Sequence, residues 1–180
     1  MGGQEKFIGR LDSLFIAESK IEGPLVSSDI SGLIGQYAHG NEPSHHIVHL
    51  YNYVNQSWKT QQLIDTILHT QYFNNPNGLS GNEDCGQMSA WYVLNAMGFY
   101  QVCPGSPIYS VGRPIFDKVT INLPNGKVFE IIANNNSLTN KYIQSIRLDN
   151  ILLESPFFMH SDIMKGGKIV MEMGNTPVKQ

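Results

Sequence analysis

The sequence predicts an α+β fold in which buried helices are followed by an antiparallel, β-sandwich-like region. Residues 1–103 carry apolar side chains at spacings of three and four, which is the period of a helix. Residues 104–180 alternate apolar and polar side chains around an Asn-Gly turn, which indicates hairpins. A Pro- and Gly-rich stretch at 103–114 separates the two parts, so we place the domain boundary there.

The first expected helices differ in how much of their surface is apolar. One apolar stripe predicts a helix over residues 4–17, and residues 18–43 are expected to form a loop because they are rich in Gly, Ser and Asp. Pro43 is typical of a helix start. The segment HHIVHLYNYV (45–54) that follows is apolar or aromatic nearly all round, so we expect a helix that is buried on every side.

Two more helices complete the predicted helical part. Ser57 is a suitable N-cap for the first of them. Residues 74–86 (NNPNGLSGNEDCG) are too rich in Asn and Gly for regular structure. Residues 87–97 then form a mostly apolar helix that Gly98 is expected to end in a left-handed conformation. Buried helices with long polar loops are typical of an α/α layered or toroidal array, whose loops gather at one mouth.

The second part is expected to contain five or six strands. KVTINL and KVFEII flank the Asn-Gly turn at 125–126, and YIQSIRL and ILLE flank a second turn at 149–150. KIVMEM is a later strand. The alternation implies one buried face, and no helix is predicted here to cover it. We therefore expect the helical part, or chain that is not present, to supply a second layer.

Composition and charge exclude several classes of protein. The formal net charge of −3 divides into −5 for residues 1–100 (four bases, nine acids) and +2 for residues 101–180 (eight bases, six acids). Neither part has the dense basic patch that nucleic acid requires, and no apolar run is long enough to span a bilayer. Cys85 and Cys103 are expected to be buried thiols rather than a disulfide. Met1 does not open a signal peptide, so the chain is either cytoplasmic or an internal piece of an exported protein.

The segment QYAHGNEPSHH (36–46) is the first with chemical potential. One carboxylate beside amide and backbone oxygens suits a hard cation such as calcium, whereas the histidines could indicate zinc, although the H-E-x-x-H pattern is absent. The alternative interpretation is structural, with His45, His46 and His49 as hydrogen-bonded core histidines.

The segment GNEDCGQ (81–87) is the second. Two adjacent acids lie between glycines just before a helix, so Asp84 is either an ordinary helix cap or a general base that activates water. Many aromatic residues accompany both segments, and such rings either stack on sugars or fill a core. The residues alone thus favour a sugar site with an oxygen-ligated cation, and they do not name a reaction.

Four segments carry a resemblance to a known family. They are HGNEPSHH (39–46), GLSGNEDCGQMSAWYVLNAMGFYQVCPGSPIY (78–109), GRPIFDKVTINLPNGKVFEI (112–131) and HSDIMKGGKIVMEMG (160–174). Together they resemble the family 92 glycoside hydrolases, which are bacterial exo-α-mannosidases, many specific for α-1,2 linkages. The resemblance extends over essentially the whole chain.

The resemblance implies an architecture and a location. The family places an N-terminal β-sandwich before an (α/α)6 barrel, and its last strands return to the sandwich. This chain would then be the C-terminal portion, and its partners would be α-mannoside oligosaccharides and the missing N-terminal part of the same polypeptide. A periplasmic, cell-surface or secreted bacterial location would follow.

The resemblance also implies a calcium-dependent mechanism that inverts configuration, in which calcium contacts the 2- and 3-hydroxyls of the sugar. The family's catalytic base belongs to the motif that here reads GNED, which makes Asp84 the base and Glu83 the less suitable candidate. Asn82 stands where some relatives have an acid. The remaining expected roles are calcium ligation by Asn41 and Glu42, and sugar contacts by His39, Asn82 and Glu83.

The family's general acid is a glutamate in a Trp-containing motif that this sequence lacks. We therefore expect the chain alone to be inactive. The alternatives are a non-catalytic carbohydrate-binding module and another α/α-barrel carbohydrate enzyme such as a phosphorylase, although no basic cluster suggests a phosphate site. Surfaces that the missing part would cover could also make the chain self-associate.

Overall fold

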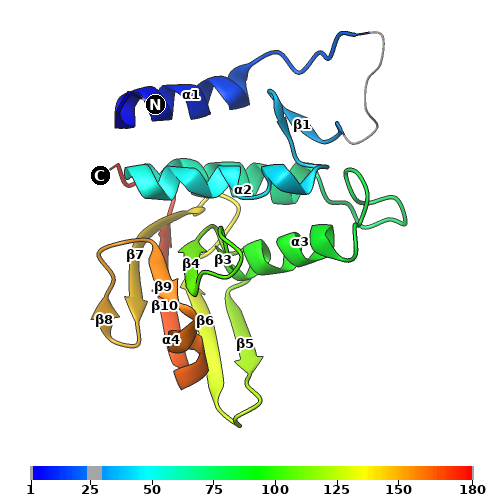
Figure 1. Cartoon of the computed structure of the whole chain (residues 1–180). Coiled ribbons are helices and arrows are strands. Elements are labelled where there is room, and N and C mark those ends of the chain that lie inside the picture. Colours follow the sequence, from blue (N-terminus) through cyan, green and yellow to red (C-terminus); the bar gives the residue numbers. More distant parts are fainter. Residues whose placement is uncertain (1, 24–29, 180) are drawn as a thin grey trace.

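A computed structural model describes residues 2–23 and 30–179 of the chain. The structure is α+β, as predicted: helices are stacked above a group of small sheets (Figure 1). Residues 24–29, within the predicted loop 18–43, lie outside the described residues. None of the helices in the described part is long and apolar enough to cross a membrane.

The helical part follows the predicted order. Its elements are α1 (Gln4–Ile16), β1 (Leu33–Ile34), β2 (Tyr37–Ala38), the 3-10 segments η1 (Glu42–Ser44) and η2 (Ile47–Val54), α2 (Ser57–Thr70) and α3 (Gln87–Met97). The helices predicted at 4–17 and 87–97 are confirmed, and Gly98 ends α3 with a φ of 103°. Ser57 is not the N-cap of α2: Gln56 precedes the first turn, without a side-chain cap hydrogen bond.

Within the segment predicted as a fully buried α-helix at 45–54, residues Ile47–Val54 form a 3-10 helix, and Asn55 after it has a left-handed conformation (φ 56°). Its burial is confirmed for most residues, including His49. His46 and Tyr53 are exposed, so the interpretation of His46 as a core histidine is wrong. The pattern predicted the buried environment, but it did not distinguish an i→i+4 from the tighter i→i+3 hydrogen bonding.

The strand-rich part forms a five-stranded sheet in the order β5-β6-β10-β7-β8 and a three-stranded sheet in the order β3-β4-β9. The elements are β3 (Phe99–Tyr100), β4 (Ile108–Val111), β5 (Lys118–Asn122), β6 (Val128–Asn134), β7 (Tyr142–Leu148), β8 (Ile151–Leu152), β9 (Phe157–Met159), α4 (His160–Lys165) and β10 (Gly167–Gly174). Both predicted hairpins, β5–β6 and β7–β8, are confirmed.

The five-stranded sheet is mixed, which corrects the prediction of a purely antiparallel sheet. β10 pairs antiparallel with β7 but parallel with β6. β6 and β7 run in opposite directions, and the chain returns between them after β9 and α4, so β10 must run parallel to one of them. Alternation identifies a buried face, but it contains no information about strand direction.

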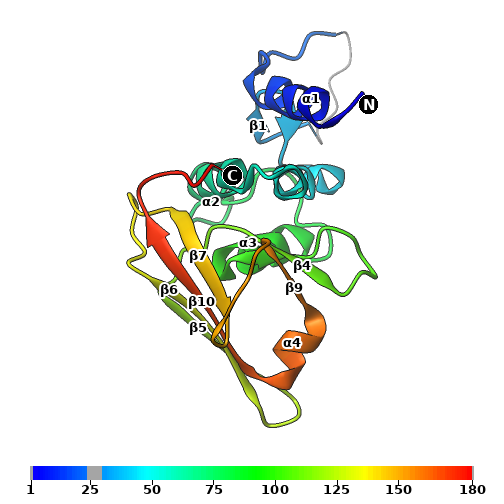
Figure 2. The same cartoon turned by 90° about the vertical axis from the view of Figure 1, so that its left-hand side faces the viewer.

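One face of the five-stranded sheet carries its own cover. Figure 2 shows β4, β9 and α4 on the same side of this sheet, and the side chains of Phe158 and Ile163 join the buried cluster that includes Phe129 and Ile169. The expectation that this part has no helix is therefore wrong. Each such buried side chain stabilises the fold by about 1.5–3 kcal/mol.

Polar contacts fasten α2 to the strand-rich part. The Gln61 side-chain oxygen accepts a hydrogen bond of 3.0 Å from the Ile143 N–H of β7. The Asp65 carboxylate lies 3.1 Å from Arg113 Nε and 2.9 Å from Lys141 Nζ, and the Arg113 side chain is 3% exposed. A strand before residue 103, β3, also pairs with β4, so a sheet spans the proposed domain boundary.

The cysteines do not follow the prediction of two buried thiols. Cys85 and Cys103 are both free and exposed. Both lie in loops rather than in helix interiors. The general preference of cysteine for burial does not hold at these two loop positions.

Candidate active site at the crossing of two loops

The structure brings together the two segments that the sequence analysis singled out. We call residues 39–44 the first loop and residues 80–86 the second loop. They cross at two glycines: a Cβ added to Gly81, whose φ is 92°, would lie only 2.5 Å from the carbonyl oxygen of Gly40. A Cβ added to Gly40 would lie 2.8 Å from the carbonyl oxygen of Ser80. Two glycines are thus required for the two loops to approach this closely.

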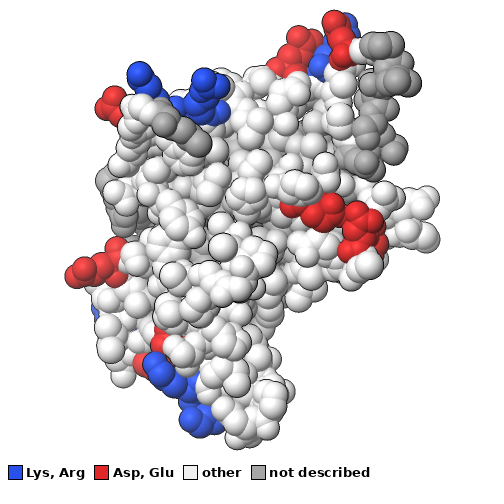
Figure 3. Space-filling view, in the orientation of Figure 1, with Lys and Arg blue, Asp and Glu red and all other residues white. Residues whose placement is uncertain are grey.

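The crossing places the Glu42 and Asp84 carboxyl groups side by side. A hydrogen bond to Glu42, and next the negative charge of Glu42, raise the pKa of the Asp84 carboxyl above its ordinary value. The Asp84 side chain is fully exposed, and so it is open to water and to a ligand. Figure 3 shows the resulting acidic patch over the connection between α2 and α3, with no Lys or Arg beside it on this face.

Glu83, the third acid, points away from this pair and caps α3. Its two carboxylate oxygens accept hydrogen bonds from the Ser89 backbone N–H (3.0 Å) and the Ser89 hydroxyl (2.8 Å). The structure therefore gives the capping role to Glu83, whereas the sequence analysis had considered it for Asp84. A sugar contact by Glu83 stays a prediction.

His39, the first residue of the first loop, is fully buried. Its Nε2 contacts the Tyr72 hydroxyl (2.7 Å), which itself donates to the Met88 carbonyl, and its Nδ1 contacts the Tyr37 hydroxyl (2.9 Å). Nε2 is therefore the protonated nitrogen, and Nδ1 accepts. Burial, and secondarily the charge of His45, lower the pKa of His39 to about 3. Both ring nitrogens are engaged within the protein, so the sugar contact of His39 stays a prediction.

His45, and Gln87, which the sequence analysis did not single out, support His39. His45, as one interpretation proposed, is a buried core histidine: its Nε2 donates to the His39 carbonyl (3.0 Å), and its carbonyl accepts from the Trp91 indole N–H (3.1 Å). Gln87 Nε2 donates to His45 Nδ1 and to the Tyr100 hydroxyl, both at 3.2 Å. A polar residue at the first position of a mostly apolar helix was the available signal for Gln87.

The two asparagines expected at the site lie at its rim. Asn41 is partly buried and precedes η1, and its carbonyl accepts a hydrogen bond of 3.0 Å from the Ser44 N–H. Asn82 is exposed on the second loop, next to Gly81. Their roles as a calcium ligand and a sugar contact stay predictions.

The donor set at the crossing fits a hard cation. Glu42 Oε1 is buried and has no hydrogen-bond partner, and the negative charge of Glu42 acts on the neighbouring Asp84 carboxyl. A cation bound beside these oxygens would satisfy Glu42 Oε1 and offset that charge. In residues 2–23 and 30–179, no group of three or more His, Cys, Asp and Glu side chains is placed to hold a metal. Calcium here would therefore depend on neutral oxygens as well.

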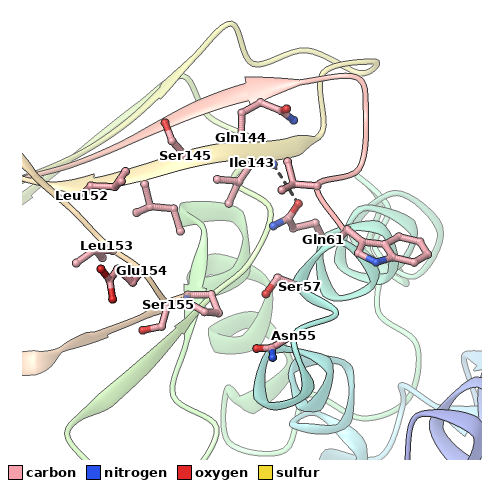
Figure 4. Close-up of a pocket in the computed structure, with 14 residues that line it drawn as sticks. Asn55, Ser57, Gln61, Ile143, Gln144, Ser145, Leu152, Leu153, Glu154 and Ser155 are labelled. Atoms are coloured by element: carbon pink, nitrogen blue, oxygen red, sulfur yellow. Dashed lines mark hydrogen bonds between the residues drawn. The ribbon is translucent and has the colours of Figure 1, made fainter. Parts of the chain in front are cut away.

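A separate cleft lies on another side of the molecule, between the start of α2 and the strands β7 and β8 (Figure 4). Its volume is about 310 Å³, and its labelled polar lining includes Asn55, Ser57, Gln144 and Glu154. None of its lining residues belongs to the two loops, so this cleft is not part of the candidate active site.

Enzymes that cleave glycosidic bonds use carboxyl groups as acid and base, and the comparison with protein families identifies the class as glycoside hydrolase. Residues 1–175 match the Glycosyl hydrolase family 92 catalytic domain. The chain therefore belongs to glycoside hydrolase family 92, as a portion of its catalytic domain.

Solved structures of this family match the chain closely. The family GH92 α-mannosidase BT3965 from Bacteroides thetaiotaomicron is 43% identical, with a TM-score of 0.88 over 98% of this chain and 23% of that chain. Its complex with mannoimidazole gives a TM-score of 0.91. The family GH92 inverting mannosidase BT2199 from the same species is 39% identical, with a TM-score of 0.83 over 98% of this chain and 25% of that chain.

A curated relative has a more distant sequence. An uncharacterized secreted glycosidase from Arthroderma benhamiae is 27% identical over 177 residues, which is 97% of this chain and 21% of the relative. The chain thus spans only a fifth to a quarter of the length of these proteins.

Proposed function

We propose that this chain is the C-terminal portion of a calcium-dependent, inverting exo-α-mannosidase that removes terminal α-1,2-linked mannose from mannan or N-glycans. The observation that carries the proposal is the pairing of Glu42 and Asp84 at the crossing of the two family motifs. The same proposal includes an (α/α)6 barrel, which the helices of this chain complete together with the missing chain. It also includes a β-sandwich that contains the strands, and a periplasmic or secreted location.

Asp84 acts as the general base. Its carboxylate accepts a proton from a water molecule while the oxygen of that water attacks the anomeric carbon on the face opposite the glycosidic bond. The raised pKa of Asp84 makes its carboxylate a stronger base than an ordinary aspartate, and its exposure keeps the water within reach. The leaving oxygen takes its proton from an acid that the remainder of the polypeptide supplies.

Glu42 and Asn41 would hold calcium at the rim of the first loop. Calcium bound there would supply a Lewis acid for the 2- and 3-hydroxyls of mannose and favour distortion of the ring toward the transition state. Glu42 presents a buried carboxylate oxygen without a hydrogen-bond partner, and Asn41 adds a neutral side-chain oxygen. Asn82 contacts the sugar from the second loop. His39 and Glu83 are the other two residues that we propose next to the sugar.

The test compares the full-length protein with the isolated chain on α-1,2-mannobiose. The full-length protein should release β-mannose, observed by proton NMR, and chelation of calcium should stop the reaction. Asp84→Asn should lower kcat by about 10³-fold or more, since it removes general-base catalysis and part of the positioning of water. The isolated chain should release no mannose.

Three results would contradict the proposal: α-mannose as the first product, full activity of Asp84→Asn, or hydrolysis by the isolated chain. The alternative, a non-catalytic carbohydrate-binding module, is tested by calorimetry of the isolated chain with mannose and calcium. Sub-millimolar binding by the isolated chain, together with no hydrolysis by the full-length protein, would indicate such a module instead.

A further inference from the structure

The second loop contains a turn with an unusual backbone. Asp84, Cys85 and Gly86 have φ angles of 44°, 57° and 88°, so three consecutive residues are in the left-handed region. Only Gly86 adopts this conformation without steric cost, because the Cβ of Asp84 and Cys85 crowds the backbone. We call residues 84–86 the left-handed turn. Something outside the turn must hold it in place.

The side chain of Glu83 is placed to do so. It immediately precedes the turn, and both of its oxygens are bonded to Ser89, the third residue of α3, at 3.0 and 2.8 Å. The helix has no other side-chain cap, because its N-cap residue is Gly86. Glu83 therefore satisfies a free N–H of the first turn and places a negative charge at the positive end of the helix.

These bonds close the left-handed turn at both ends. Glu83 fixes its start and Gly86, as the N-cap, fixes its end on α3, so residues 84 and 85 have little freedom to relax. The backbone bonds across the same turn are longer, at 3.2 Å from Gln87 N to Asp84 O and 3.3 Å from Met88 N to Glu83 O. With Glu83 turned toward the helix, the neighbouring Asp84 side chain is left facing Glu42 on the first loop.

We propose that Glu83 is a positioning residue whose clamp on Ser89 maintains the left-handed turn and thereby presents the Asp84 carboxylate to the crossing of the two loops. The proposal depends on the proposed function only for the role of Asp84 as the base. The clamp itself is a property of the chain, and it can be measured without any substrate.

The experiment uses proton NMR on the isotope-labelled 180-residue chain. A strong intraresidue NOE between Hα and the amide proton marks a residue with positive φ, so the wild-type chain should give it at Asp84 and Cys85. Glu83→Ala should lose the signal at both residues while the circular dichroism spectrum is kept. Glu5→Ala is the matched control, because it also removes an acid from the first turn of a helix and should leave both signals unchanged.

Variants of Ser89 keep the test decisive if Glu83→Ala does not fold. Ser89→Ala removes only the hydroxyl donor and should weaken the NOE signals at Asp84 and Cys85. Ser89→Thr retains the hydroxyl and should keep both signals at wild-type strength. A folded Glu83→Ala or Ser89→Ala variant with wild-type signals at Asp84 and Cys85 would overturn the proposal.

Kinetics of the full-length protein separate this proposal from the function itself. Glu83→Ala should lower kcat by about 10²-fold, since misplacing a catalytic group by about 1 Å has an effect of that order. If Asp84→Asn is fully active but Glu83→Ala still loses the NMR signals, the clamp stands and the assignment of the base fails.

Discussion

Acid should destabilise this protein through His49, a fully buried residue of η2 that contacts Ser110 of β4. Its Nε2 lies 3.0 Å from the Asn95 side-chain oxygen, and its Nδ1 lies 3.2 Å from the Ser110 hydroxyl. Since Asn95 presents an oxygen, Nε2 carries the proton and Nδ1 accepts the hydroxyl. Ser110 Oγ in turn accepts a hydrogen bond of 2.7 Å from Asn52 Nδ2. Protonation of Nδ1 would reverse the Ser110 hydrogen bond and bury a charge.

The magnitude follows from the change in pKa on folding. Burial, offset in part by the Asn95 hydrogen bond and reinforced by His46, lowers the pKa of His49 from 6.5 to about 4. The unfolded chain therefore takes up a proton first as the pH falls. The contribution of His49 to stability is complete above pH 6.5 and is lost as the pH falls toward 4. The full loss is about 3 kcal/mol, and about 2 kcal/mol of it falls between pH 7 and pH 5.

Urea unfolding of the isolated chain at pH 7 and pH 5 measures this loss. His49→Gln should be less stable at pH 7, but its stability should fall by about 2 kcal/mol less than that of the wild type between the two pH values. The matched control, His160→Gln at an exposed position, should retain the wild-type pH dependence. Equal losses in His49→Gln and wild type, or an imidazole NMR titration of His49 near pH 6.5, would refute the reasoning.

Two substitutions test the crossing of the loops and the joint between the two parts of the fold. Gly81→Ala should cost about 1–3 kcal/mol and separate the loops, because its φ is 92° and the new Cβ would meet the Gly40 carbonyl. The control is Gly105→Ala, at a φ of 84°, where a new Cβ would meet no atom within 4 Å, so it should lower the stability by less. Equal urea midpoints for Gly81→Ala and Gly105→Ala would contradict this account. Asp65→Asn should lower the free energy of unfolding by about 3 kcal/mol in the same assay, since it leaves the buried Arg113 without its counter-charge. A decrease below about 1 kcal/mol would show that the pair contributes no more than a surface ion pair.

Local patterns were sufficient for most of the fold. The hairpin at 125–126 and the helix end at Gly98 were predictable because each depends on a few neighbouring residues. The parallel pairing of β10 with β6 was not, because strand direction depends on how the chain travels between strands that are distant in sequence. The exposure of Cys85 was also missed, since cysteine's average preference says nothing about an individual loop.

For the candidate site, the sequence by itself determined the two motifs, the family they belong to and the residue types that suit a sugar and a hard cation. Only the tertiary structure decided how the acids divide their tasks. It turned Glu83 toward Ser89 and Asp84 toward Glu42. The physical reason is that adjacent acids are equivalent in a pattern, whereas a left-handed turn and the crossing at Gly40 and Gly81 point them in different directions.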